Sequence, residues 1–234
     1  FISSYAMFSP GRNWEQIRTT ICYNNQNVKI AGAHSGVSVG PDGATHQAIE
    51  DIAITRVIPN MVVIAPCDAI EAKKATIAAA RYKCPVYIRF TREKTPVMTT
   101  EETPFEIGQA EIYREGKDVT LIGCGPLVYE ALRAAEELAK DGIEAEVINN
   151  HTIKPMDKDT ILKSVKKTGC IVSIEEHQAA GGMGSAVSEI LSQNYPAPME
   201  IIGIQDRFGE SGEPAELLEK FGLTAKNIIE AVKR

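Results

Sequence analysis

A short loop between residues 33 and 47 carries the side chains of this chain that are best suited to chemistry. It reads AHSGVSVGPDGATHQ and contains His34, Asp42 and His46, with glycines at positions 36, 40 and 43. Histidine titrates near neutral pH and suits proton transfer, and a carboxylate can orient a polar substrate. Glycine admits backbone conformations that other residues resist, so the loop can turn these groups toward one small molecule. The loop therefore predicts a site for proton transfer, although a single loop histidine is more often a surface residue.

Two regular elements are expected to position this loop. An apolar run at 28–33 predicts a buried strand before it, and a helical apolar period at 49–57 predicts a helix after it. The same alternation continues, with strands expected at 61–65, 85–90, 119–123, 145–148, 170–174 and 199–204, and helices at 10–23, 68–82, 127–140, 158–167, 184–193 and, as two short pieces, at the C-terminus. Alternation of this kind is typical of α/β folds with parallel sheets, whose ligands lie at the carboxyl ends of the strands.

The alternation breaks once, between Thr91 and Gln109, in a stretch rich in threonine, proline and charge. We therefore expect two consecutive α/β domains with mostly parallel sheets. The first covers residues 1–98, a linker covers 99–108, and the second covers 109–234.

Composition narrows the class of protein. Of 234 residues, 44% are hydrophobic and 24% charged, which is ordinary for a globular protein, and no apolar run is long enough to span a bilayer. The net charge of -6 argues against nonspecific nucleic-acid binding, and five scattered cysteines without a CxxC pair indicate reduced thiols in the cytoplasm. The chain opens at Phe1 without an initiator methionine, so we expect a fragment or a trimmed chain.

Several weaker motifs are assigned no chemistry, and no metal site is expected. The G-C-G sequence at 123–125 has Val128 where a dinucleotide fingerprint needs its third glycine. The glycines at 181, 182 and 184 could cradle an anion, but close packing of a strand and a helix is the commoner use. Adjacent Glu175, Glu176 and His177 alternate sides of an extended chain and cannot readily converge on a metal, and His151 is expected in a loop.

A family resemblance rests on two long stretches. The first, SVGPDGATHQAIEDIAITRVIPNMVVIAPCDAIEA, resembles the pyrimidine-binding domain of transketolase, in which a G-x-D-G-x-T-H-Q loop precedes a helix. The second, VTLIGCGPLVYEALRAAEELAKDGIEAEVINNHTIKPMD, resembles the C-terminal domain of that family. The resemblance covers essentially the whole chain and is greatest to the separately encoded C-terminal subunit of split transketolases. It implies a thiamine-diphosphate-binding fold of the pyrimidine type, lacking its start, followed by the C-terminal domain fold.

The resemblance also implies roles for individual residues. His34 and His46 match histidines that contact the donor sugar and its reacting oxygens, and so they are the expected catalytic residues. Asp42 matches an aspartate that contacts a sugar hydroxyl. Arg92, by itself an ordinary solvated charge, matches an arginine that holds the sugar phosphate, a task suited to its planar guanidinium.

The same resemblance implies a cofactor and a partner. Tyr5 and Phe8, whose helical spacing alone would suggest core positions, match rings that line the aminopyrimidine pocket of thiamine diphosphate. The diphosphate and its Mg²⁺ are held in the family by another domain, and the activating glutamate lies upstream of the part that Phe1 begins. We therefore expect the chain to be inactive alone and to form a hetero-oligomer, including a dimer of this subunit, with an N-terminal subunit. Sugar phosphates of the pentose phosphate pathway are the expected substrates.

Three alternatives stay open at this stage. Deoxyxylulose-phosphate synthase shares the D-G-x-T-H-Q motif but usually lacks a histidine matching His34. The beta subunit of a 2-oxoacid dehydrogenase is a related thiamine-diphosphate protein. A noncatalytic interaction subunit is the third, but a pure scaffold has no physical need for two histidines and an aspartate in one loop.

Overall fold

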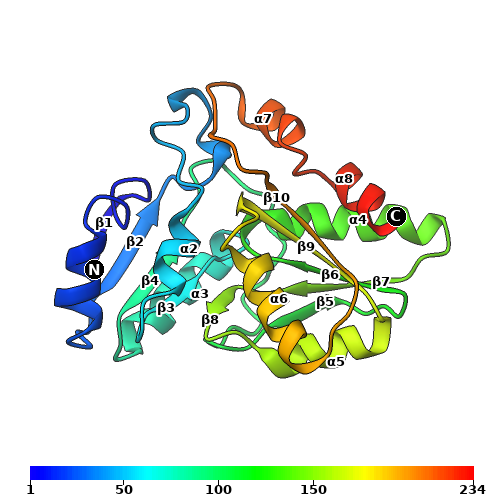
Figure 1. Ribbon diagram of the computed structural model, residues 1–234, viewed down its shortest axis with the longest axis horizontal. Helices are drawn as coiled ribbons and strands as arrows, with labels where there is room; N and C mark the ends of the chain where they lie inside the picture. The colour runs from blue at the N-terminus through cyan, green and yellow to red at the C-terminus, as the bar shows by residue number, and fades with distance from the viewer.

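The chain folds around two five-stranded sheets, which the computed structural model describes over residues 1–234 (Figure 1). The first sheet has the order β1-β2-β4-β3-β8. Its strands are β1 (Ile2–Tyr5), β2 (Lys29–Ala33), β3 (Val62–Ile64), β4 (Val86–Arg89) and β8 (Thr152–Lys154). All neighbouring strands are parallel except β8, which pairs antiparallel with β3. The helical segments of this half are α1 (Trp14–Gln16), a π-helix (Ile17–Cys22), α2 (Asp51–Arg56) and α3 (Ala69–Arg81).

The second sheet has the order β10-β9-β6-β7-β5 and is likewise parallel except for its edge strand β5. Its strands are β5 (Glu111–Arg114), β6 (Val119–Gly123), β7 (Ala145–Asn149), β9 (Ile171–Gln178) and β10 (Met199–Ile204). The helices are a short 3-10 turn (Gly125–Leu127), α4 (Val128–Lys140), α5 (Lys158–Thr168), α6 (Met183–Asn194), α7 (Pro214–Lys220) and α8 (Ala225–Val232). None of the helices has the length and apolar character that a membrane crossing requires.

The two sheets share their hydrophobic core. One cluster of 20 buried residues joins Ile30 and Tyr87 of the first sheet to Ile122 and Ile148 of the second. Another cluster of 21 buried residues is built mainly on the second sheet, α4 and α8. It also includes Val37 from the loop at residues 33–47, which holds His34 and His46 and is called the histidine loop below. The strand β8 adds to this connection, because it comes from the second half of the chain and pairs in the first sheet. The halves therefore pack as one body, and packed interiors transmit positional constraints between them.

Most of the strands and helices expected from the sequence are present. Asp68 caps α3 as its side chain accepts a hydrogen bond from the backbone N–H of Glu71 at 2.8 Å, which satisfies one of the free donors of the first turn. No helix or strand occupies the stretch between β4 and β5. The histidine loop follows β2 directly, at the carboxyl end of that strand.

The N-terminal region differs from the expectation. The helix expected at 10–23 begins only at Trp14 and continues as a π-helix from Ile17. Tyr5 and Phe8 do not lie on a helix, because residues 2–5 form β1 and pair with β2, where Tyr5 is opposite Ala33. Helical spacing over so few residues is a weak local signal, and the open edge of β2 offered backbone hydrogen bonds that outweighed it.

Candidate functional site

The histidine loop folds tightly on leaving β2. His34 adopts a left-handed backbone conformation with φ of 57°, and Gly36 follows with φ of 84°. Residues Val37–Asp42 then form 3-10 turns. At Gly36 only glycine fits, because a Cβ would lie 2.3 Å from the carboxyl carbon of Glu176, a residue of β9. The strained backbone at His34 is the kind of conformation that functional sites retain when the surrounding structure enforces it.

Four rings meet at the edge of this loop. The ring of Tyr5 lies 4.2 Å from that of His34 and 5.9 Å from that of His46, measured between centroids. The ring of Phe8 lies 5.3 Å from that of His46 at an angle of 83°, and 6.1 Å from that of Tyr5. All four side chains are half-buried. The structure thus brings together four residues that the sequence places 41 positions apart at most, since they come from β1, its following turn and both ends of one loop.

The two imidazoles differ in their polar contacts. His46 Nδ1 lies 2.9 Å from the hydroxyl of Thr45, which fixes the ring orientation. His34 Nδ1 is buried and has no hydrogen-bond partner. Because a buried polar atom without a partner costs free energy, this nitrogen is suited to bind a group supplied from outside the chain.

Asp42 and Arg92 contact each other at the rim of the same loop. Arg92 Nη1 donates to Asp42 Oδ1 at 3.0 Å and to the backbone oxygen of Val39 at 3.0 Å. Both side chains are partly exposed, so their ion pair contributes little to stability. The remaining guanidinium N–H groups stay available to an anionic ligand.

Beneath the loop lies a buried ion pair that sequence reasoning missed. Arg89 Nε donates to Asp51 Oδ2 at 2.8 Å, and the hydroxyl of Tyr87 donates to the same oxygen at 2.7 Å. Burial alone would raise the pKa of Asp51, but the charge and hydrogen bonds of Arg89, together with His177 and Tyr87, lower it. Nothing local in the sequence pairs these residues, because Asp51 and Arg89 come from α2 and β4.

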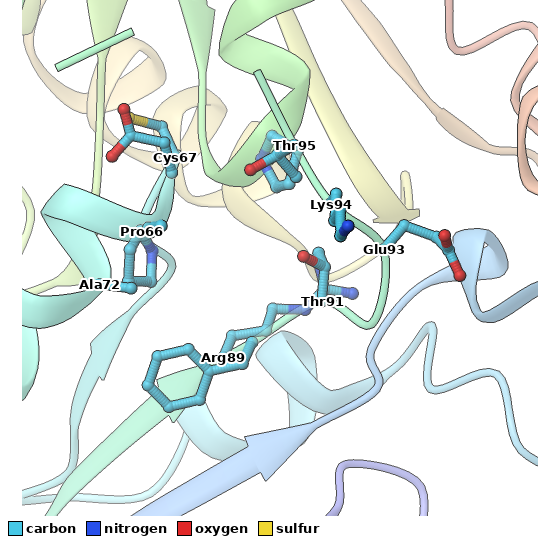
Figure 2. A pocket seen from close by; sticks show the side chains of 12 residues that line it. Pro66, Cys67, Ala72, Arg89, Thr91, Glu93, Lys94 and Thr95 are labelled. Carbon is cyan, nitrogen blue, oxygen red and sulfur yellow. The ribbon is translucent and has the colours of Figure 1, made fainter. Parts of the chain in front are cut away.

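A cavity of about 380 Å³ opens beside this ion pair, at the carboxyl ends of β3 and β4 (Figure 2). Arg89, Thr91, Glu93 and Lys94 line it on one side and Cys67 on another. Burial and the nearby Glu71 raise the pKa of the Cys67 thiol far above its usual range, so this thiol stays protonated and is a poor nucleophile. The cavity wall does not include the rings of Tyr5, Phe8, His34 or His46.

The weaker motifs have structural contacts in this fold. Glu175 accepts hydrogen bonds from the backbone N–H groups of Met183 at 2.6 Å and Gly184 at 2.8 Å, so its carboxylate fills the N-terminus of α6. Glu176 contacts the histidine loop, and His177 Nε2 accepts from the backbone N–H of Ala53 at 3.3 Å. These three side chains therefore point to separate partners.

The glycines that follow β9 allow this strand and α6 to pack closely. A Cβ at Gly182 would lie 2.3 Å from a carboxylate oxygen of Glu175, which leaves no room for a side chain between strand and helix. His151 lies in the connection between β7 and β8, as expected of a loop residue, but it is fully buried.

Comparisons with known proteins agree with this fold. The family model of the transketolase pyrimidine-binding domain matches residues 1–98, and that of the transketolase C-terminal domain matches residues 108–228. A putative transketolase C-terminal section from Methanocaldococcus jannaschii is 46% identical over 100% of this chain and 75% of its own length. A 6-deoxy-6-sulfo-D-fructose transketolase subunit from a Clostridium species is 42% identical over 99% of this chain and 72% of its own length.

Solved structures give the same result. A structure described as a split gene transketolase, inactive beta4 tetramer, superimposes with a TM-score of 0.93 at 44% identity and covers 99% of this chain and 74% of its own. Transketolase from Campylobacter jejuni superimposes with a TM-score of 0.79 at 22% identity over 99% of this chain and 35% of its own, and so shares the fold.

The two mostly parallel α/β sheets and the two family models, one for each half of the chain, define a chain of the class of thiamine-diphosphate-dependent enzymes. The chain belongs to the transketolase family and corresponds to the C-terminal section of split transketolases. It is therefore a subunit of a transferase, and the expectation drawn from the two sequence stretches is confirmed.

Proposed function

We propose that this subunit, together with an N-terminal subunit, transfers a two-carbon glycolaldehyde unit from a ketose phosphate to an aldose phosphate. The observation that carries the proposal is the cluster of rings formed by Tyr5, Phe8, His34 and His46, beside which the Nδ1 atom of His34 has no hydrogen-bond partner. A flat heteroaromatic ring needs aromatic faces to pack on, and the rings of Tyr5 and Phe8 in this cluster supply them.

The cluster fits the aminopyrimidine end of thiamine diphosphate. Tyr5 and Phe8 would hold it, because their rings are half-buried and lie beside the two imidazoles. When bound, thiamine diphosphate supplies the carbanion chemistry that the side chains of this subunit cannot provide. We assign the diphosphate and Mg²⁺ to the N-terminal subunit, a proposal supported by the relative named as a C-terminal section of a transketolase.

The remaining residues act on the sugar. His34 and His46 move protons to and from its oxygens and donate hydrogen bonds as negative charge develops there. Asp42 orients a hydroxyl group, and Arg92 binds the phosphate through its free N–H groups. Their mutual contact at 3.0 Å keeps both side chains at the rim of the loop before a sugar arrives.

The names of the relatives indicate sugars as the class of substrate, and they do not single out one sugar. Relatives at 42% and 38% identity are named for 6-deoxy-6-sulfo-D-fructose and apulose-4-phosphate. We propose the phosphates of the pentose phosphate pathway as the first substrates to test. We place the subunit in the cytoplasm, in agreement with its five free cysteines.

The test is ketol transfer by the chain mixed with an N-terminal subunit, thiamine diphosphate and Mg²⁺. His34→Ala is expected to lower turnover by about a hundredfold or more, since proton transfer by a positioned side chain contributes about 10²–10⁴. Tyr5→Ala is expected to weaken cofactor binding. Tyr23→Ala, which removes an 85% exposed ring of the same type, is the matched control and should leave both unchanged.

Three results would contradict the proposal. Turnover by the isolated chain would refute the need for a partner. Transfer from pyruvate in place of ketose phosphates would indicate a synthase or dehydrogenase. Unchanged turnover in His34→Ala would contradict a catalytic role for the loop.

A further inference from the structure

The histidine loop is tied to the C-terminal half of the chain by one buried carboxylate. Glu176, on β9, accepts a hydrogen bond from the backbone N–H of Ser38 at 2.5 Å through Oε1. Its second oxygen accepts from the hydroxyl of Ser38 at 3.1 Å. Glu176 is only 3% exposed, and the missing side chain of Gly36 leaves the space that its carboxylate occupies. The loop is therefore shaped around this group.

The position of Glu176 is itself held from the first sheet. Arg89 Nη2 donates to the backbone oxygen of Glu176 at 2.8 Å, while Nε of the same guanidinium pairs with Asp51. Burial raises the pKa of Glu176, although the charge of Arg89 and the hydrogen bonds from Ser38 oppose that shift. A polar network that spans both halves in this way has few alternative arrangements, because each broken contact would leave a buried group unpaired.

A second tie lies at the other end of the loop. Gln47, directly after His46, donates through Nε2 to the backbone oxygens of Val37 at 3.1 Å and Gly40 at 3.2 Å. The same nitrogen lies 2.9 Å from the backbone oxygen of Glu210, in the segment between β10 and α7. In Figure 1 this segment runs beside the loop that follows β2, and α7 packs against the 3-10 turns. The C-terminal half thus contacts the loop at two places, through Glu176 at Ser38 and through the segment before α7 at Gln47.

We propose that Glu176 is a positioning residue for the transfer reaction. Its carboxylate holds the Ser38 backbone so that His34 and His46, at the two ends of the loop, keep the geometry that the donor sugar requires. This inference rests on the proposed function, because it assigns to the C-terminal half a task at that same site. Because the Glu176 carboxylate is bonded to the loop backbone at Ser38, we assign it an effect on the position of the loop.

The physical basis is the steep dependence of catalysis on position. A displacement of reacting groups by about 1 Å can cost about a hundredfold in rate. Without the carboxylate, the Ser38 N–H would be left buried and unpaired, and the loop would gain other conformations. The cofactor would still bind against the rings of Tyr5 and Phe8, because these residues belong to β1 and the turn after it and not to the loop.

The experiment compares Glu176→Ala, Glu176→Gln and Glu175→Ala in the complex with the N-terminal subunit. Glu176→Ala is expected to lower kcat by about tenfold to a hundredfold, with the Kd of thiamine diphosphate unchanged within about twofold. Glu176→Gln keeps the shape and an oxygen for the Ser38 N–H, so it should restore most of the activity. Glu175→Ala is the matched control, because Glu175 is an equally buried acid of the same strand that contacts α6 instead of the loop.

Hydrogen exchange at the Ser38 amide supplies a readout independent of turnover. In Glu176→Ala this amide should exchange faster, while amides of β10 remain as protected as in the native chain. Equal losses of kcat in Glu175→Ala and Glu176→Ala, or unchanged kcat and exchange in Glu176→Ala, would overturn the inference. If the native complex shows no ketol transfer, the proposed function fails, and amide exchange still decides whether Glu176 holds the loop. Should Glu176→Ala not fold, Ser38→Ala removes one of the two hydrogen bonds, and unchanged turnover and loop exchange there would count against the inference.

Discussion

His151 provides a pH-dependent test of the packing between the two halves. Its ring is fully buried and stacks on Phe105, with centroids 4.3 Å apart and an angle of 29° between the planes. Nδ1 lies 2.9 Å from the hydroxyl of Thr152, while Nε2 has no partner. Burial lowers the pKa of His151 from 6.5 to about 4, because a charged ring here would lose water while its Nε2 gains no acceptor.

The sign of the effect follows from proton binding. The unfolded chain, in which His151 has its ordinary pKa, binds a proton before the folded chain does as the pH falls. The contribution of His151 to stability is therefore fully present above its ordinary pKa and is lost as the pH decreases toward about 4. With these two pKa values, linkage gives a loss of about 2 kcal/mol in the free energy of unfolding between about pH 7.5 and about pH 5.

The assay is urea unfolding of the native chain and two variants at these two pH values, at one protein concentration. His151→Phe keeps a ring against Phe105, and His151→Asn keeps a hydrogen-bonding group beside Thr152. Neither replacement titrates, so each variant should lose about 2 kcal/mol less than the native chain on acidification. Buried Glu71, Glu175 and Glu176 have raised pKa values and also titrate on acidification, but they are present in all three proteins and cancel in the comparison.

The reasoning would be refuted if both variants kept the pH dependence of the native chain. That result would mean that His151 is hydrated or paired in the folded state. An equal loss in the free energy of unfolding at both pH values, with the pH dependence of the native chain unchanged, would show that the ring contributes packing alone.

Three further substitutions test the buried contacts by urea unfolding. Asp51→Asn leaves Arg89 without its counter-charge and should cost about 3–5 kcal/mol, so a loss below about 1 kcal/mol would mean that water reaches the pair. Gly182→Ala forces a Cβ against Glu175 and should cost about 1–3 kcal/mol, and part of this loss should return when Glu175→Asp is added; no recovery would argue against the steric cause. Asp68→Ala removes the cap of α3 and the acceptor for two backbone N–H groups after β4, so it should cost about 2 kcal/mol, and a neutral result would contradict the capping role.

The sequence alone predicted the alternation of strands and helices and the loop that follows β2. These features depend on local hydrophobic periodicity and on short-range signals such as the cap at Asp68, which a linear pattern contains. The family resemblance then identified the transketolase domains, because a match over a long stretch is more specific than a match at single residues.

Other features could not be predicted in this way. Tyr5 forms part of a strand because β2 has an open edge, and β8 joins the first sheet although it belongs to the second half of the chain. The local conformational preferences of these residues are weak. Backbone hydrogen bonds to strands elsewhere in the fold outweighed them and decided both placements.

Residue types and spacing in the sequence thus determined which loop holds His34 and His46, and that it follows a strand. Only the tertiary structure decided that Tyr5 and Phe8 face those imidazoles and that Glu176, 138 positions from Ser38, lies beneath the loop. The physical reason is that contacts between distant segments depend on how sheets stack and cores pack, and no local pattern records those distances.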